Sequence, residues 1–171
     1  NTDKVHFTDA GYLYIAECMY EKITGKKAPI EEKVKIPHTQ QSGETNYFTF
    51  AEGKWEAGDA QHTWSKKVDP AHPEATYYEV KFTGHKIDIY SGKNRMMGKV
   101  KYLIDGEEKA EGDLYNATNI NSTFITTISD LEEKEHTLKA VATGERNASG
   151  TGSDILIDAA EVYVYTYREP E

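Results

Sequence analysis

The sequence has a single cysteine, Cys18, among its 171 residues. No internal disulfide can form, and cysteine usage does not reveal the compartment. No apolar run approaches the ~20 residues that a membrane-spanning helix needs, and no basic segment followed by an apolar stretch marks a secretion signal. The length suits one domain of ordinary size with an appendage. Two full enzymatic domains are excluded.

Positive charge is also scarce, because 20 Lys and Arg residues stand against 29 Asp and Glu residues and give a net charge of -9. This balance repels a phosphate backbone, so we expect no nucleic-acid partner. The sequence is instead rich in turn formers and aromatic residues, with 13 Gly, twelve Tyr and two Trp. This composition favours an all-β domain with many turns.

Only one segment has a helical period. Apolar residues recur at helical spacing between residues 8 and 24, Thr8 and Asp9 offer a cap, and Gly25 offers a stop. Residues 28–45 are rich in charge and contain Pro37, without any period. They predict a linker, or an extended segment that lies on a surface.

Beyond residue 46 the period changes to two, and short runs rich in Val, Ile, Tyr, Phe and Thr alternate with turns. One buried face per strand is typical of two antiparallel sheets packed face to face. Asp105-Gly106 and Thr83-Gly84 indicate tight hairpins. We therefore predict an antiparallel β-sandwich over residues 46–171, with strands near 46–51, 75–82, 85–90, 99–104, 111–115, 122–128, 136–142 and 155–167.

If these strands run up and down, their connections alternate between the two ends of the sandwich. The long loops 58–74, 91–98, 116–121 and 143–153 then gather at one end, where a rigid sandwich often carries its binding site. Those loops contain residues suited to a sugar, since aromatic rings stack on its apolar face and planar polar groups bond its hydroxyls. The candidates are His62, Trp64, Asn94, Arg95, Tyr115, Asn116, Asn119, Asn121, Arg146 and Asn147.

Two readings of these residues stay open at this point. Trp64 either stacks on a ligand or belongs to the core near a strand end, and each Asn either binds a ligand or serves its turn. Only the expected location of these residues at the same end of the sandwich favours a ligand-binding site. Arg95 and Arg146 make an anionic sugar the first ligand to test.

Several stretches resemble a carbohydrate-binding module of the galactose-binding-domain-like, jelly-roll type. They are GKWEAGDAQHTWS, YYEVKFTGHKIDIYSG, VKYLIDGEEK, LEEKEHTLKAVATG and ILIDAAEVYVY, which together span about residues 46–167. Glu135 stands where a Gly often precedes the His. The resemblance implies a jelly-roll sandwich, a glycan or polysaccharide as partner and a structural calcium ion, with Glu52 and Asp158 as candidate oxygen ligands.

Residues 1–27 resemble a different family, the SGNH or GDSL-type esterases. Their last sequence block has the form Asp-x-x-His followed by a helix, which Asp3, His6 and FTDAGYLYIAECMYEKI match. In such enzymes the His takes the serine proton and the Asp orients it. The resemblance implies an upstream catalytic domain whose nucleophile would precede residue 1. We expect the present chain itself to be inactive.

The hypothesis is a non-catalytic carbohydrate-binding module, extracellular or at the cell surface, that holds an esterase near a polysaccharide or host glycan. Two alternatives stay open. One is a protein-interaction or cell-wall-anchoring sandwich that presents residues such as Tyr163, Tyr165 and Tyr167. The other is a β-sandwich hydrolase, although no metal-site spacing, Gly-x-Ser-x-Gly elbow or phosphate loop is present.

Overall fold

The computed structural model describes residues 9–37, 47–57, 63–65 and 67–167, apart from the side chains of Asp9, Ala57 and Trp64. The predicted class is confirmed, since these residues form two large antiparallel sheets and a small third sheet, preceded by one α-helix. Within this part of the chain, no helix combines the length and the apolar character that spanning a bilayer requires.

The helix α1 covers Asp9–Thr24, and a short 3₁₀ helix, η1, covers Pro73–Ala75. The strands are β1 (Ile30–Pro37), β2 (Phe48–Phe50), β3 (Trp55–Ala57), β4 (Thr63–Ser65), β5 (Tyr77–Gly84), β6 (Lys86–Lys93), β7 (Gly98–Ile104), β8 (Glu107–Asp113), β9 (Ile120–Ile128), β10 (Lys134–Arg146), β11 (Leu156–Ile157) and β12 (Ala159–Thr166).

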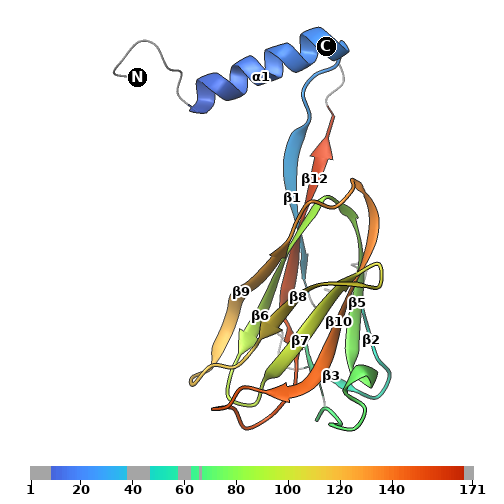
Figure 1. The fold of residues 1–171 in the computed structure, drawn as a ribbon, viewed down its shortest axis with the longest axis vertical. Coiled ribbons are helices and arrows are strands. Elements are labelled where there is room, and N and C mark those ends of the chain that lie inside the picture. The colour runs from blue at the N-terminus through green and yellow to red at the C-terminus, as the bar shows by residue number, and fades with distance from the viewer. Residues whose placement is uncertain (1–8, 38–46, 58–62, 66, 168–171) are drawn as a thin grey trace. The chain divides into compact units, whose positions relative to one another are not determined.

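The chain divides into two compact units, and the sandwich is the unit made by residues 33–164. One sheet has the order β1-β12-β6-β9, and the second has the order β2-β5-β10-β7-β8 (Figure 1). A small third sheet, β11-β4-β3, carries short strands from both halves of the domain. The strand pairs are antiparallel, as one-sided burial favours: β2·β5, β5·β10, β10·β7, β7·β8, β12·β6, β6·β9, β11·β4 and β4·β3.

The other unit contains α1, and the predicted end of this helix is confirmed. Gly25 follows Thr24 with φ +69°, a backbone conformation that glycine adopts without steric cost. None of the described side chains of α1 is buried, and Ile23 is 78% exposed. Periodicity therefore predicted the helix correctly, although most of its large apolar side chains are exposed.

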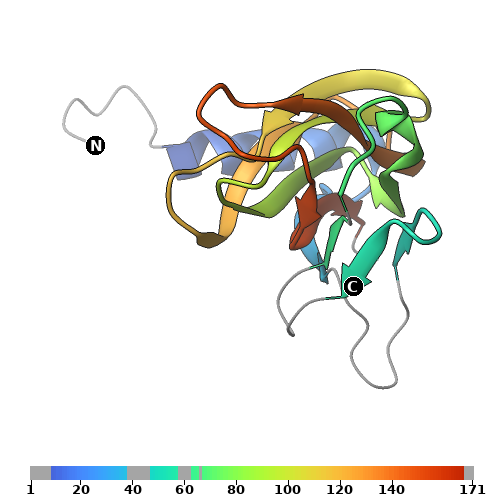
Figure 2. The ribbon, with the colours of Figure 1, turned by 90° about the horizontal axis from the view of Figure 1, so that it is seen from below.

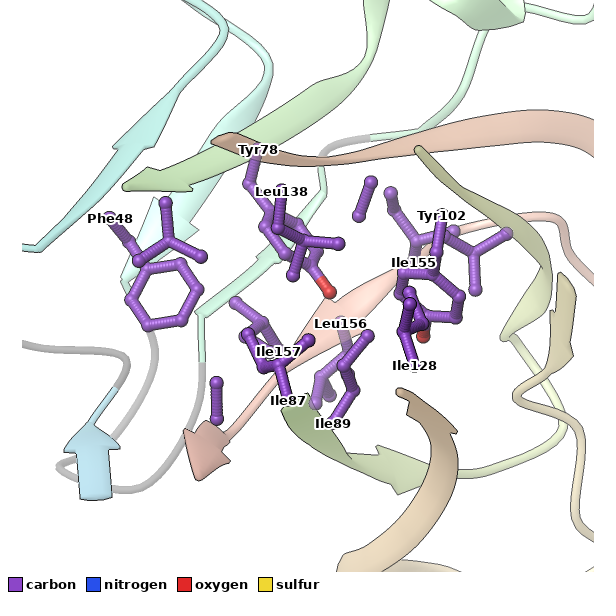
Figure 3. Close-up of a cluster of buried hydrophobic side chains, with 14 of the residues drawn as sticks. Phe48, Tyr78, Ile87, Ile89, Tyr102, Ile128, Leu138, Ile155, Leu156 and Ile157 are labelled. Carbon is purple, nitrogen blue, oxygen red and sulfur yellow. The ribbon is translucent and has the colours of Figure 1, made fainter. Parts of the chain in front are cut away.

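The core lies between the two large sheets (Figure 3). Tyr78, Tyr102 and Leu138 reach it from the five-stranded sheet, and Ile87 and Ile89 reach it from the four-stranded sheet; all five are fully buried. Their alternation with exposed or half-buried residues along β5, β6, β7 and β10 is the period of two that the sequence displays. Burial of these apolar faces stabilises the sandwich.

The predicted Asp105-Gly106 hairpin is confirmed between β7 and β8. Asp105 and Gly106 have φ of +52° and +88°, which is the pair of positive values that a type I′ turn needs. The Asp105 carboxylate also accepts hydrogen bonds from the Thr137 amide, at 2.8 Å, and from the buried His136 ring, at 2.7 Å. The turn is thus tied to strand β10.

Some strands differ from expectation. β1 lies within residues 28–45, where the sequence predicts a linker or extended segment, and it forms an edge of the four-stranded sheet. Most of its residues are exposed, so it shows no alternation. β3 and β4 have only three residues each, which is too short to establish a period. The predicted strand near 111–115 corresponds to β8, which begins earlier, at Glu107.

Candidate functional site

Residues from all four predicted long loops meet at one end of the sandwich. That end is the lower one in Figure 1, and Figure 2 looks onto it. Two hollows of about 650 and 740 Å³ open there, each within the range of ligand pockets. Lys67, Met96 and Asp154 line both. The hollows therefore adjoin at these three residues. Together they are called the loop-end groove below, and each hollow is one of its lobes.

Asp154 holds two of these loops together. Its Oδ1 accepts hydrogen bonds from the backbone N–H of Val68, at 3.0 Å, and from the Ser65 hydroxyl, at 3.4 Å. The Ser65 Oγ in turn accepts the backbone N–H of Ile155, at 3.0 Å. Ser65 and Val68 are buried, so these hydrogen bonds are shielded from water. They therefore hold the wall of the groove in place.

Arg95 ties the remaining loops. Its Nε donates to the carbonyl of Ala117, at 2.8 Å, and its own carbonyl accepts the Thr151 amide, at 2.7 Å. Gly152 allows the close approach, because a Cβ there would lie 2.4 Å from the Met96 carbonyl oxygen. Arg95, predicted as a ligand-binding residue, thus also has a structural role at this end.

The predicted asparagines fall into two groups. The amide of Asn116 donates to the carbonyl and hydroxyl of Thr118, and the amide of Asn147 donates to Asp113. The Asn116 amide therefore stabilises its own loop, and the Asn147 amide ties its loop to the end of β8. Asn119 and Asn121 line the first hollow, are exposed, and have no hydrogen-bond partner among the described residues. They are free to bond a ligand.

Asn94 also lines the first hollow, and its Oδ1 accepts the Met96 amide, at 2.8 Å. Arg146 is exposed and lines the second hollow. Tyr115 is half-buried and forms an isolated β-bridge with Asn94. It lines neither hollow. The structure therefore brings four predicted residues to the groove, namely Asn94, Asn119, Asn121 and Arg146.

Two predicted residues are not described in full. His62 lies outside the described residues, and so does the side chain of Trp64. The backbone of Trp64 belongs to β4, where its Cα is paired with Leu156 on one side and Glu56 on the other. Both of those partners line the first hollow.

Sequence reasoning missed the charged lining of the groove. Lys67 and Lys93 line the first hollow together with Glu56 and Asp154. Lysines and carboxylates are common on any sandwich surface, so no local pattern marks these four. Only their position near the ends of the long loops could have indicated a place in the site. Their convergence depends on strand pairing between β6, β9, β11 and β4.

The neighbouring lysine Lys99 has a different environment. Its Nζ lies 2.8 Å from a carboxylate oxygen of Glu145. This hydrogen bond and the charge of the Lys99 ammonium hold the pKa of the Glu145 carboxyl below its ordinary value. Lys99 therefore already has a counter-charge, whereas Lys67 and Lys93 have no ion-pair partner within the described chain.

The candidate calcium ligands Glu52 and Asp158 line neither hollow. Glu52 is exposed in the turn after β2, and Asp158 precedes β12 and accepts a hydrogen bond from Ser122. In the described ranges, no three His, Cys, Asp or Glu side chains are grouped so that they could hold a metal ion. The calcium ion stays a prediction of the resemblance. Asp3 and His6 fall outside the described residues.

No known protein-family model matches the chain, and neither does any curated protein sequence. Solved structures do resemble it. A two-domain esterase active on acetylated mannans matches 98% of this chain with a TM-score of 0.55 and 14% identity. Its structure with mannopentaose matches 99%, with a TM-score of 0.54 and 12% identity.

A family two carbohydrate esterase from Clostridium thermocellum, in complex with cellohexaose, matches 72% of the chain with a TM-score of 0.50 and 15% identity. The chain spans 50% of the length of the two-domain esterase and 34% of the length of the Clostridium enzyme. At these identities the likeness concerns the backbone only. The chain therefore shares the sandwich fold found in parts of carbohydrate esterase structures.

Proposed function

We propose that the chain is a carbohydrate-binding module whose ligand lies in the loop-end groove. The observation that carries this proposal is the pair Asn119 and Asn121, whose amides face no partner in the described chain and line a hollow of about 650 Å³. Planar amides donate and accept at once, which suits neighbouring hydroxyls on a sugar ring. The second hollow extends the groove, so a chain of sugars is a better fit than one terminal unit.

Trp64 supplies the aromatic part of this proposal. Its strand partners Leu156 and Glu56 both line the first hollow, and this pairing supports a role for Trp64 at the groove. An indole that stacks on the apolar face of a sugar contributes buried area and orients the ring. Within the proposal Trp64 stacks while Asn94, Asn119 and Asn121 bond the hydroxyls.

The role of the module is to hold a catalytic domain of the same protein at its polysaccharide. The Asp3 and His6 pattern supports an SGNH-type esterase as that domain. The structural likeness to esterases studied with mannopentaose and cellohexaose also supports it. Tethering raises the effective concentration of substrate even when each contact is weak, which fits a secreted or cell-surface enzyme.

A glycan array tests the proposal directly. The chain should bind at least one oligosaccharide, and Trp64→Ala and the double variant Asn119→Ala/Asn121→Ala should each abolish the signal while unfolding remains unchanged. Tyr47→Ala is the matched control, because Tyr47 is 48% exposed but lies outside both lobes of the groove. Binding that survives in Trp64→Ala and in the double variant would place the ligand elsewhere.

One observation favours a second candidate, a hydrolase. The carboxylates of Glu56 and Asp154 line the same hollow, and glycosidases use two carboxylates that flank the scissile bond. Turnover of aryl glycosides by the chain, lost in Glu56→Gln, would support catalysis. Binding without turnover would support the module.

A further inference from the structure

Positive side chains gather at the loop-end groove although the protein as a whole is acidic. Lys67 and Lys93 line the first hollow, and Lys67 and Arg146 line the second. Arg95 lies in the loop between β6 and β7 that borders both. Four cations thus lie at one end of a chain whose net charge is -9.

Most other lysines of the sandwich have a carboxylate partner. Such pairs are typical of a solvated surface and contribute little to stability one by one. The ion pairs of this kind are Lys33–Glu161, Lys99–Glu145, Lys101–Glu108, Lys109–Glu107, Lys134–Glu132 and Lys139–Glu79, with N–O distances of 2.8 to 3.1 Å.

The groove differs from this pattern. Within the described residues, the side chains of Lys67, Lys93 and Arg146 have no hydrogen-bond or ion-pair partner. This holds even though Asp154 lines both hollows and Glu56 lines the first. Asp154 directs its Oδ1 to the Val68 amide and the Ser65 hydroxyl instead. These three cations therefore lack the direct carboxylate partner that most other lysines of the sandwich have.

We propose that the ligand of the loop-end groove is an acidic polysaccharide, whose uronate carboxylates are bound by Lys67, Lys93 and Arg146. This inference rests on the proposed function and names its ligand class. A carboxylate gives each cation a charge-assisted hydrogen bond, which is stronger than a bond between neutral groups. Lys67 lines both hollows and lies where successive sugars of one chain would pass from one lobe to the other.

Matched pairs of oligosaccharides test the inference by calorimetry on the whole chain. The acidic probes are an oligogalacturonate, a glucuronoxylan oligosaccharide and an oligomannuronate. Their neutral counterparts are the methyl ester of the first, a xylo-oligosaccharide and a manno-oligosaccharide. We expect one acidic probe to bind at least about tenfold more tightly than its counterpart, as a charge-assisted contact predicts. Added salt should reduce that preference.

Charge variants then assign the preference to residues. Lys67→Gln and Lys93→Gln should each weaken acidic binding about three- to tenfold and leave neutral binding unchanged. Lys81→Gln is the matched control, since Lys81 is exposed on the outer face of the five-stranded sheet and also lacks an ion pair in the described chain. It should leave both affinities unchanged.

The outcomes separate the two proposals. Equal binding of acidic and neutral probes would overturn the acidic ligand and leave the carbohydrate-binding function intact. An acidic preference that survives in Lys67→Gln/Lys93→Gln would overturn the assignment to these lysines. Failure of every probe, acidic and neutral, would count against both the ligand class and the function.

Discussion

Asp154 is the side chain whose removal tests the construction of the groove most directly. Replacement by Ala removes the acceptor of the Val68 amide and of the Ser65 hydroxyl. Val68 is only 3% exposed, so its N–H group would stay buried without a partner. The contact between Val68 and Asp154 would be lost with it, whereas the hydrogen bonds between Ser65 and Ile155 would remain.

The magnitude follows from those two bonds. A buried donor left without an acceptor costs about 1–3 kcal/mol, and a bond to a charged acceptor lies in the upper part of that range. The Ser65 contact is long, at 3.4 Å, and adds little. We expect Asp154→Ala to lower the free energy of unfolding by about 2 kcal/mol, which corresponds to about 4–8 °C in Tm for a chain of this size.

Asp154→Asn is the matched variant, because its amide oxygen can still accept the Val68 N–H. It should cost about 1 kcal/mol or less, since only the charge of the acceptor is lost. Urea unfolding followed by tryptophan fluorescence gives both values, and amide hydrogen exchange at Val68 reports the local opening. The reasoning fails if Asp154→Ala unfolds like the unmodified protein and the Val68 amide stays equally protected.

Three further predictions concern other parts of the sandwich. Gly98→Ala should lower the free energy of unfolding by about 2–3 kcal/mol, measured by urea unfolding, because the added Cβ would lie 2.4 Å from a backbone carbonyl oxygen. The pKa of Asp105 is lowered by the hydrogen bond from the Thr137 amide, so its contribution is present above the ordinary value of 3.8 and is lost as the pH falls through the folded-state value. Asp105→Asn should therefore be less stable at neutral pH and lose less on acidification; a parallel acid profile would refute this. The hydrogen bond to Asp88 raises the pKa of Tyr163 to about 12, so the neutral hydroxyl stabilises the fold below the unfolded value of 10.0, and this contribution is lost as the pH rises to about 12. Tyr163→Phe should decline less than the unmodified protein between these values in alkaline unfolding experiments, and an equal decline would show that another group is responsible.

The sequence predicted those parts of the fold that repeat a local rule. Tyr78, Val80 and Phe82 recur with a period of two because alternate residues of a strand point to the same, buried face of the sheet. Asp105-Gly106 predicted its turn because few residues accept two successive positive φ values. The sequence did not predict β1, because an exposed edge strand has no buried face and therefore no alternation of apolar and polar residues.

The candidate site was predicted less completely. Loop parity placed Asn94, Asn119, Asn121 and Arg146 at one end, and the structure brings them to the groove. Asn116 resembles Asn119 in sequence context, yet its amide is bonded within its own turn. Which asparagine is free depends on the conformation of a few backbone bonds, and a residue pattern does not specify that conformation.

The amino-acid sequence by itself determined the sandwich class, the helix end at Gly25 and the end of the sandwich where the long loops gather. These features follow from periodicity and from the steric limits of single residues. The tertiary structure decided that Lys67, Lys93 and Asp154 share a groove. Residues from loops so far apart in the chain meet only through strand pairing and through hydrogen bonds such as Asp154 to Val68, which are interactions between distant segments.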